Sequence, residues 1–325
     1  MKVSLNIQTI LTVLVVFLFA LPLSVSAQVP ARFYWKSLDG GSAVPVIYMD
    51  MSGNSNPLDP SHFVVPESSF EASVALGGYA KAFSLFDRSA LVAALLPVGR
   101  ISGGGSLFGR DFNQNTNGFG DPTLEFVINV LGPPSIKNIP EAMRYEPGFS
   151  VDLLVDLIVP IGEYDNEEVL NMGQNRWYGR IGAPVVWQIG SWVPGRRTTL
   201  ELLPSAWVFG DNDDFVGHTL STDPKFQLEA HLTRDFHKDL WGSIDINWMR
   251  GGKSSLDGLE GDDLDMVGLG FTLGYQFSDN VQLTAGYLAS VNDDGPTDLQ
   301  MDVFKVSLVF GWHPLVEGMK RLGGE

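Results

Sequence analysis

The sequence DMVGLGFTLGYQF, residues 265–277, alternates large apolar side chains with small or polar ones at every second position. Val267 and Leu269 fall on one parity, and Gly268 and Gly270 fall on the other. A period of two indicates a β-strand with one apolar face. Because the opposite face is too small and polar to form a protein core, we expect the apolar face to contact lipid around a polar interior, as in a transmembrane β-barrel.

The same alternation continues through the rest of the chain. It returns in residues 280–291 and 302–312, and it holds in 148–160, where Asp152 and Asp156 share one parity. Charged side chains on that parity are very costly against lipid, whereas a wet or hydrogen-bonded lumen accommodates them. The charged parity therefore predicts which face of each strand points inward.

Twelve segments carry enough of this pattern to be candidate strands, and most have the length that about 9–11 tilted residues need to cross a bilayer. The twelve segments are 42–51, 70–82, 87–101, 120–131, 148–160, 176–190, 197–210, 224–236, 240–250, 264–277, 280–291 and 302–312. An even number of strands places both termini on one side of the membrane. The predicted fold class is all-β: a transmembrane antiparallel up-and-down β-barrel of about 12 strands.

The lengths of the connections support this topology independently. Short connections, such as 278–280, alternate with long ones, such as 52–69 and 102–119, as periplasmic turns alternate with extracellular loops. The connection 132–147 breaks the rule, and we expect it to hold a short helix or a flap. No apolar run after residue 27 approaches the roughly 20 residues that a spanning helix needs.

The N-terminus is typical of a secretory signal peptide. Lys2 provides the positive charge, Ile10 to Leu23 are mostly apolar, and Val25-Ser26-Ala27 offers small residues for cleavage. The predicted domains are the signal peptide 1–27, an N-terminal segment 28–41 that could plug the lumen, the outer-membrane barrel 42–312 and a C-terminal tail 313–325. The sequence has no cysteine, so disulfides and thiolate chemistry are excluded.

Nine charged or titratable residues fall on the inward parity and are our candidates for the solute path. They are Glu125, Asp152, Asp156, Arg180, Glu201, Glu229, His231, Asp245 and Lys305. Opposite charges inside a narrow lumen can hold it closed or set its selectivity, or they can simply brace the wall. Trp177, Trp192, Trp241, Trp248 and Trp312 lie near predicted strand ends, where tryptophan favours the membrane interface.

The composition and motifs argue against several other functions. A net charge of −17 disfavours nucleic acid as a partner, because its binding depends on Lys and Arg. No HExxH, GxSxG or phosphate-loop motif is present, so we predict no metal, no cofactor and no catalytic residues. Acidic loops such as 163–168, 211–214, 260–263 and 292–294 could bind calcium, but they lack EF-hand spacing and fit a solvated rim.

With the strands placed, the chain resembles the outer-membrane transporter family named for the MetA pathway of phenol degradation. The resemblance is carried by 118–125 (GFGDPTLE), 159–164 (VPIGEY), 171–175 (NMGQN), 200–211 and 43–48 (AVPVIY). These motifs are Gly, Pro and Asp around strand ends, in a fixed order over about residues 40–312. The strand that ends near Trp312 is followed by a tail, which departs from barrels that end on an aromatic assembly residue.

The resemblance implies an outer-membrane channel for passive uptake of small hydrophobic or aromatic compounds such as phenol. It brings no catalytic residues. The implied partners are the solute, outer-membrane lipid and the barrel assembly machinery, and the implied location is the bacterial outer membrane. Two alternatives stay open: an outer-membrane lipid hydrolase, which needs a Ser and a His together on the lipid-facing surface, and a structural or adhesive barrel.

Overall fold

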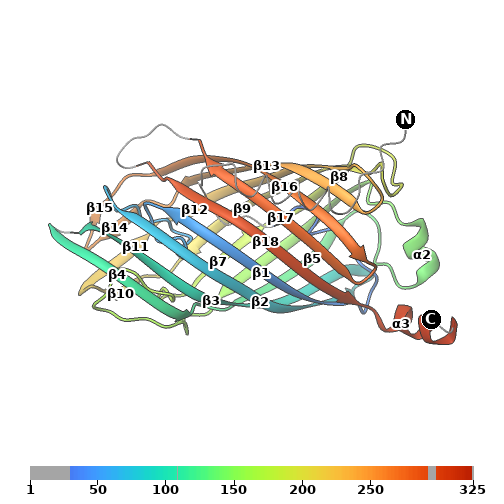
Figure 1. Cartoon of the computed structure of the whole chain (residues 1–325), viewed down its shortest axis with the longest axis horizontal. Coiled ribbons are helices and arrows are strands. Elements are labelled where there is room, and N and C mark those ends of the chain that lie inside the picture. The colour runs from blue at the N-terminus through green and yellow to red at the C-terminus, as the bar shows by residue number, and fades with distance from the viewer. Residues whose placement is uncertain (1–29, 108, 292–297, 324–325) are drawn as a thin grey trace, which may run out of the picture.

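The computed structural model describes residues 30–107, 109–291 and 298–323. The predicted signal peptide and the acidic run 292–294 lie outside these residues. The chain forms a closed antiparallel barrel of 12 strands, which confirms the predicted fold class (Figure 1). No helix in the described ranges is long and apolar enough to cross a membrane.

Each of the twelve predicted segments contains a strand, and the sixth is divided into two pieces. The fourth strand of the wall also includes a piece from the predicted loop 102–119. The wall consists of β1 (Ser42–Gly53), β2 (Ser69–Leu85), β3 (Arg88–Leu107), β4 (Arg110–Phe119) with β5 (Thr123–Leu131), β6 (Phe149–Ile158), β7 (Tyr178–Gly182) with β8 (Val185–Gln188), β9 (Thr198–Phe209), β12 (Lys225–Asp235), β13 (Leu240–Gly251), β16 (Leu264–Ser278), β17 (Val281–Ser290) and β18 (Met301–Trp312). Neighbours in the chain pair antiparallel, and pairing of β1 with β18 closes the barrel.

The hairpin β3–β4 is longer than the sequence predicted. Residues 102–119, expected as a loop, pair in register from Val98 with Phe119 to Leu107 with Arg110. Glycine and asparagine in this stretch give no apolar alternation, so only the pairing of the two strands reveals them as strands. The break at 120–122 follows, where Asp121 accepts hydrogen bonds from the backbone N–H groups of Gly162 (2.8 Å) and Gln174 (2.7 Å).

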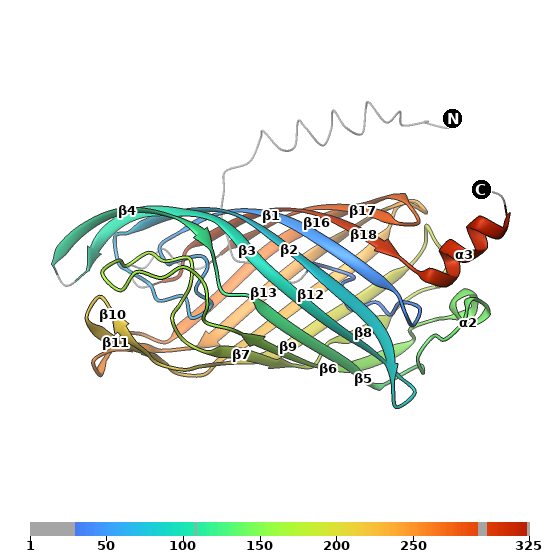
Figure 2. The ribbon, with the colours of Figure 1, turned by 90° about the horizontal axis from the view of Figure 1, so that it is seen from below.

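The two ends of the barrel differ in the way that the connection lengths predicted. We call them the turn end, which carries the short turns, and the loop end, which carries the long loops. The turn end also carries the two helices α2 (Ile139–Arg144) and α3 (Pro314–Gly323) (Figure 2). Helix α2 lies in the exceptional connection 132–147, where a short helix or flap was expected. At the loop end, β10 (Asn212–Phe215), β11 (His218–Thr222), β14 (Ser254–Leu256) and β15 (Leu259–Glu260) form a separate four-stranded sheet.

The burial of alternate residues shows which face points outward. In β6, Leu153, Val155 and Leu157 are 38%, 40% and 43% exposed, whereas Asp152 and Asp156 are 5% and 4% exposed. The apolar side chains therefore cover the outside and the carboxylates lie inside. A continuous apolar exterior of this kind is far larger than the patches that water-soluble monomers expose, and it is suited to lipid.

Candidate functional site

The nine predicted inward residues all lie on the lumen face of the barrel. Each is at most 9% exposed, and the strand register places them on the face that the outer apolar residues leave free: Glu125, Asp152, Asp156, Arg180, Glu201, Glu229, His231, Asp245 and Lys305. The structure separates them into three groups by their contacts. The first is Glu125, Asp156, Arg180 and Glu229, the second is His231, Asp245 and Lys305, and the third is Asp152 and Glu201.

Arg180 holds the first group together. Its Nε lies 2.7 Å from Asp156 Oδ2 on β6, and its Nη1 lies 2.8 Å from Glu229 Oε1 on β12. Glu125 is the register partner of Asp156 on β5, and the Trp207 ring lies 5.1 Å from the guanidinium. One cation on β7 thus links β6 with β12, which β7 and β9 separate in the wall. We call Glu125, Asp156, Arg180 and Glu229 the ion-pair layer.

A second polar network lies beside this layer on β12, β13 and β16. His231 Nδ1 lies 2.7 Å from Asp245 Oδ1, and the Thr272 hydroxyl donates to Asp245 Oδ2 at 2.6 Å. A small cavity of about 10 Å³ is lined by Asp245, Thr272, Lys305 and the apolar Leu288 and Val303. His231 therefore faces the lumen, and it cannot belong to the lipid-facing Ser–His pair that a lipid hydrolase needs.

The remaining two predicted residues, Asp152 and Glu201, contact the N-terminal segment, residues 30–41. The backbone N–H of Arg32 donates to Glu201 Oε2 at 2.7 Å, and Trp35 Nε1 donates to Glu201 Oε1 at 2.8 Å. Lys36 Nζ lies 2.9 Å from Asp152 Oδ1. Since both carboxylates are on the lumen wall, the segment lies inside the barrel, where it supplies a cation to Asp152 and two N–H donors to Glu201.

Two tryptophans predicted at the membrane interface pack against this segment instead. Trp241 is 4% exposed, and its ring lies 4.4 Å from the Arg32 guanidinium. The Trp192 ring packs against Trp35 with ring centroids 4.7 Å apart and an angle of 54° between the ring planes. A Cβ on Gly274 would overlap the Trp241 indole, so this glycine makes room for a packed ring. The alternation predicts which face of a strand a tryptophan lies on. It does not predict that a segment inserted into the lumen will pack against the tryptophan ring.

Arg176 at the loop end is a cluster centre that sequence reasoning missed. Its side chain is 1% exposed; Nη2 lies 3.1 Å from Asp59 Oδ1 and 2.9 Å from the Ser61 hydroxyl. Its Nη1 donates to the Thr222 hydroxyl at 3.0 Å, and Lys225 Nζ donates to the backbone oxygen of Pro60. This cluster ties together the loops 54–68, 159–177 and 210–224. Arg176 is the first residue of the predicted strand 176–190 and shares the parity of Arg180, and this parity was the signal that could have identified it.

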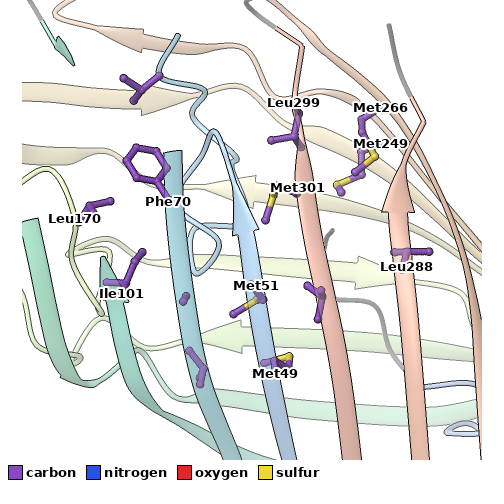
Figure 3. Packing of buried hydrophobic residues seen from close by; sticks show 14 of the residues in the cluster. Met49, Met51, Phe70, Ile101, Leu170, Met249, Met266, Leu288, Leu299 and Met301 are labelled. Atoms are coloured by element: carbon purple, nitrogen blue, oxygen red, sulfur yellow. The ribbon is translucent and has the colours of Figure 1, made fainter. Parts of the chain in front are cut away.

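The lumen beneath these loops is apolar, which the sequence did not predict. A cluster of buried side chains there includes Met51, Phe70, Ile101, Met249 and Met301, from strands on one side of the barrel (Figure 3). At the turn end, a cavity of about 370 Å³ is bordered by Ser37 and Leu38 of the N-terminal segment and by the small wall residues Ala43, Ala80 and Ala82. No group of three potential metal-ligating side chains occurs in the described residues.

Comparisons with known proteins agree with this geometry. A family model for the MetA-pathway of phenol degradation matches residues 53–302. The crystal structure of the COG4313 outer membrane channel from Pseudomonas putida F1 is similar to the barrel, with a TM-score of 0.68 and 21% identity over 87% of this chain and 99% of that one. The β domain of the Bordetella autotransporter BrkA has a TM-score of 0.48 and 10% identity over 84% and 100%. No curated sequence matches the chain.

Proposed function

The chain belongs to the MetA-pathway of phenol degradation family, and on this premise we propose that it is a bacterial outer-membrane channel for passive uptake of small hydrophobic or aromatic compounds. The turn end then faces the periplasm and the loop end faces outward, as in other bacterial barrels. The single observation that carries the proposal is a lumen that is apolar beneath the outer loops and charged below them. An apolar section of the lumen does not favour the passage of hydrophilic solutes.

The ion-pair layer supports selectivity against ions. Arg180 pairs with two of the three carboxylates of this layer, Asp156 and Glu229, at hydrogen-bond distance. An ion passing through must compete with these buried pairs, whereas a neutral solute exchanges no charge with them. The nine inward residues thus act, in this proposal, as the wall of the solute path rather than as simple braces.

The N-terminal segment acts as the plug in this proposal. Arg32, Trp35 and Lys36 bind wall residues on β12, β9 and β6, so they hold the segment along one arc of the barrel wall. The segment blocks the direct route to the periplasm, and it must shift before a solute leaves. The apolar cavity of about 370 Å³ beside Leu38 is the space from which a solute would exit.

Uptake into vesicles tests the proposal. Phenol crosses plain phospholipid bilayers unaided, so the vesicles need a lipopolysaccharide outer leaflet that slows spontaneous entry. We expect radiolabelled phenol to enter faster with the protein than without it, and benzenesulfonate of similar size to show no such acceleration, because its charge meets the ion-pair layer. Equal phenol entry rates with and without the protein would overturn the proposal.

A further inference from the structure

Methionine is concentrated at one place in the lumen. Six of the nine methionines of the chain belong to the buried apolar cluster: Met49, Met51, Met172, Met249, Met266 and Met301. Five come from the loop-end parts of β1, β13, β16 and β18 (Figure 3). Met172 lies in the connection between β6 and β7 and belongs to the same buried cluster. Each of the six is at most 8% exposed. We call these six residues the methionine chamber.

The chamber needs an explanation beyond loop packing. Barrel lumens are commonly polar, and the apolar side chains commonly lie on the outward face that contacts lipid. Leucine or isoleucine would fix the loops with better-defined rotamers. Methionine has three rotatable bonds and a polarizable sulfur, so it yields to an incoming apolar group and contacts aromatic ring edges favourably. A wall of methionines is therefore suited to taking a ligand that displaces side chains.

The chamber is bounded by polar groups above and below. The Arg176–Asp59 pair joins the loops that cover it, at 3.1 Å. Below, Met49 is the register partner of Lys305 across β1 and β18. The cavity of about 10 Å³ lies at this boundary, since Leu288 and Val303 of the apolar cluster line it together with Asp245 and Lys305. An apolar body in the chamber would thus have its lower end next to hydrogen-bonding groups.

We propose that the methionine chamber is the binding site of the transported solute, and that its preferred ligand has an apolar ring with one hydroxyl directed at the Asp245–Lys305 boundary. This inference rests on the proposed function and adds to it where the solute binds and which chemistry is recognised. The ring displaces methionine side chains, and the hydroxyl donates to Asp245 or accepts from Lys305.

Methyl NMR of protein labelled with [methyl-¹³C]methionine in lipid nanodiscs tests the proposal. The probe is p-cresol, and toluene is the matched probe without the hydroxyl. Met143 and Met319 are 83% and 54% exposed and serve as internal controls. We expect saturable shifts of the chamber methyls, assigned by single Met→Leu variants, while the two controls stay in place. Shifts of equal size at all methyls, or none at the chamber, would overturn the site.

Affinity separates the hydroxyl contact from the apolar contact. We expect p-cresol to bind at least about 10-fold more tightly than toluene, the factor that one hydrogen bond of about 1.4 kcal/mol gives. Asp245→Asn should remove most of this difference and leave toluene affinity unchanged, which also shows that the chamber is intact. Equal affinity of p-cresol and toluene in the unmodified protein would contradict the hydroxyl contact.

The two proposals fail in different ways. Phenol uptake into the vesicles without any shift of the chamber methyls would refute this site and leave the channel function standing. Saturable shifts at the chamber without uptake would support the site and refute the channel.

Discussion

Arg32 and Asp235 form an ion pair of 2.7 Å between the N-terminal segment and β12, and both side chains are almost fully buried. Arg197 also contacts Asp235, with Nε 2.8 Å from Oδ2. The pair therefore joins a segment inside the lumen to the wall at the turn end. Because its guanidinium also donates to the Thr233 hydroxyl at 3.3 Å, Arg32 fixes the segment to β12 through two side chains.

Arg32→Ala should loosen the N-terminal segment and raise ionic conductance. The variant removes one positive charge from beside Asp235, which then keeps only Arg197 as its cation, so the lumen should favour cations. Single-channel recording in planar bilayers measures both effects. The current should be larger, and the reversal potential should shift toward the equilibrium potential of the cation. Arg144→Ala, on the exposed helix α2, is the control and should leave both unchanged. Unaltered conductance of the Arg32 variant would argue against the segment as a plug.

Arg180→Met should destabilise the barrel and admit cations. The substitution leaves Asp156 and Glu229 buried without their shared cation, and loss of one partner from such a pair costs about 3–5 kcal/mol. Urea unfolding in detergent measures the stability. Adding Asp156→Asn and Glu229→Gln should recover much of it, because neutral amides tolerate the missing cation. A variant as stable as the unmodified protein would show that the layer contributes little to folding.

Gly274→Ala should displace Trp241. Its Cβ would overlap the indole, and forcing an extra methyl into a packed site costs about 1–3 kcal/mol. The Arg32 guanidinium lies against the Trp241 ring, so displacing the ring should loosen the N-terminal segment. We therefore also expect higher conductance. Gly311→Ala is the matched control, since a Cβ there would meet only Ser42 O, at an ordinary 3.8 Å. Identical behaviour of the two variants would contradict the packing argument.

Arg176→Gln should release the outer loops. Its guanidinium joins Asp59, Ser61 and Thr222, so its loss removes a buried pair worth about 3 kcal/mol. Hydrogen exchange of residues 54–68 should then speed up by on the order of 100-fold, the factor that this energy gives. Arg110→Gln, at an exposed position of β4, should leave that exchange unchanged. Slow exchange in the Arg176 variant would show that other contacts hold the loops.

His62 should make the loop 54–68 less stable in acid. Burial lowers the pKa of its imidazole well below the usual value, and the Lys225 ammonium lowers it further. The unfolded loop binds a proton below about pH 6.5 and the folded loop does not, so stability is fully present above that pH. As the pH decreases below about 6.5, the stability of the folded loop falls by about 1.4 kcal/mol per pH unit.

Hydrogen exchange of this loop measures the acid effect, after correction for the intrinsic pH dependence of exchange. His62→Gln carries no titrating group and should flatten the profile between pH 7 and pH 5. Matching profiles for the two proteins would assign the acid sensitivity to another group.

Much of the barrel could be predicted from the chain alone. A period of two assigns every strand residue to one of two faces, and Asp152 and Asp156 identify the inner one because lipid excludes charge. The breaks in the fourth and sixth strands and the length of β3–β4 escaped prediction. Glycine, asparagine and proline weaken the alternation there, and backbone pairing with a neighbouring strand decides the structure.

The sequence by itself determined twelve strand segments and their inward parity, and with these the lumen side of all nine candidate residues. Only the tertiary structure decided their partners: Asp152 pairs with Lys36, 116 positions away, and Asp59 pairs with Arg176, 117 positions away. It also decided that Trp241 packs in the lumen and that six methionines meet in one chamber. Alternation is a local property of neighbouring residues, whereas these contacts arise only when the barrel closes and the N-terminal segment and the loops fold into it.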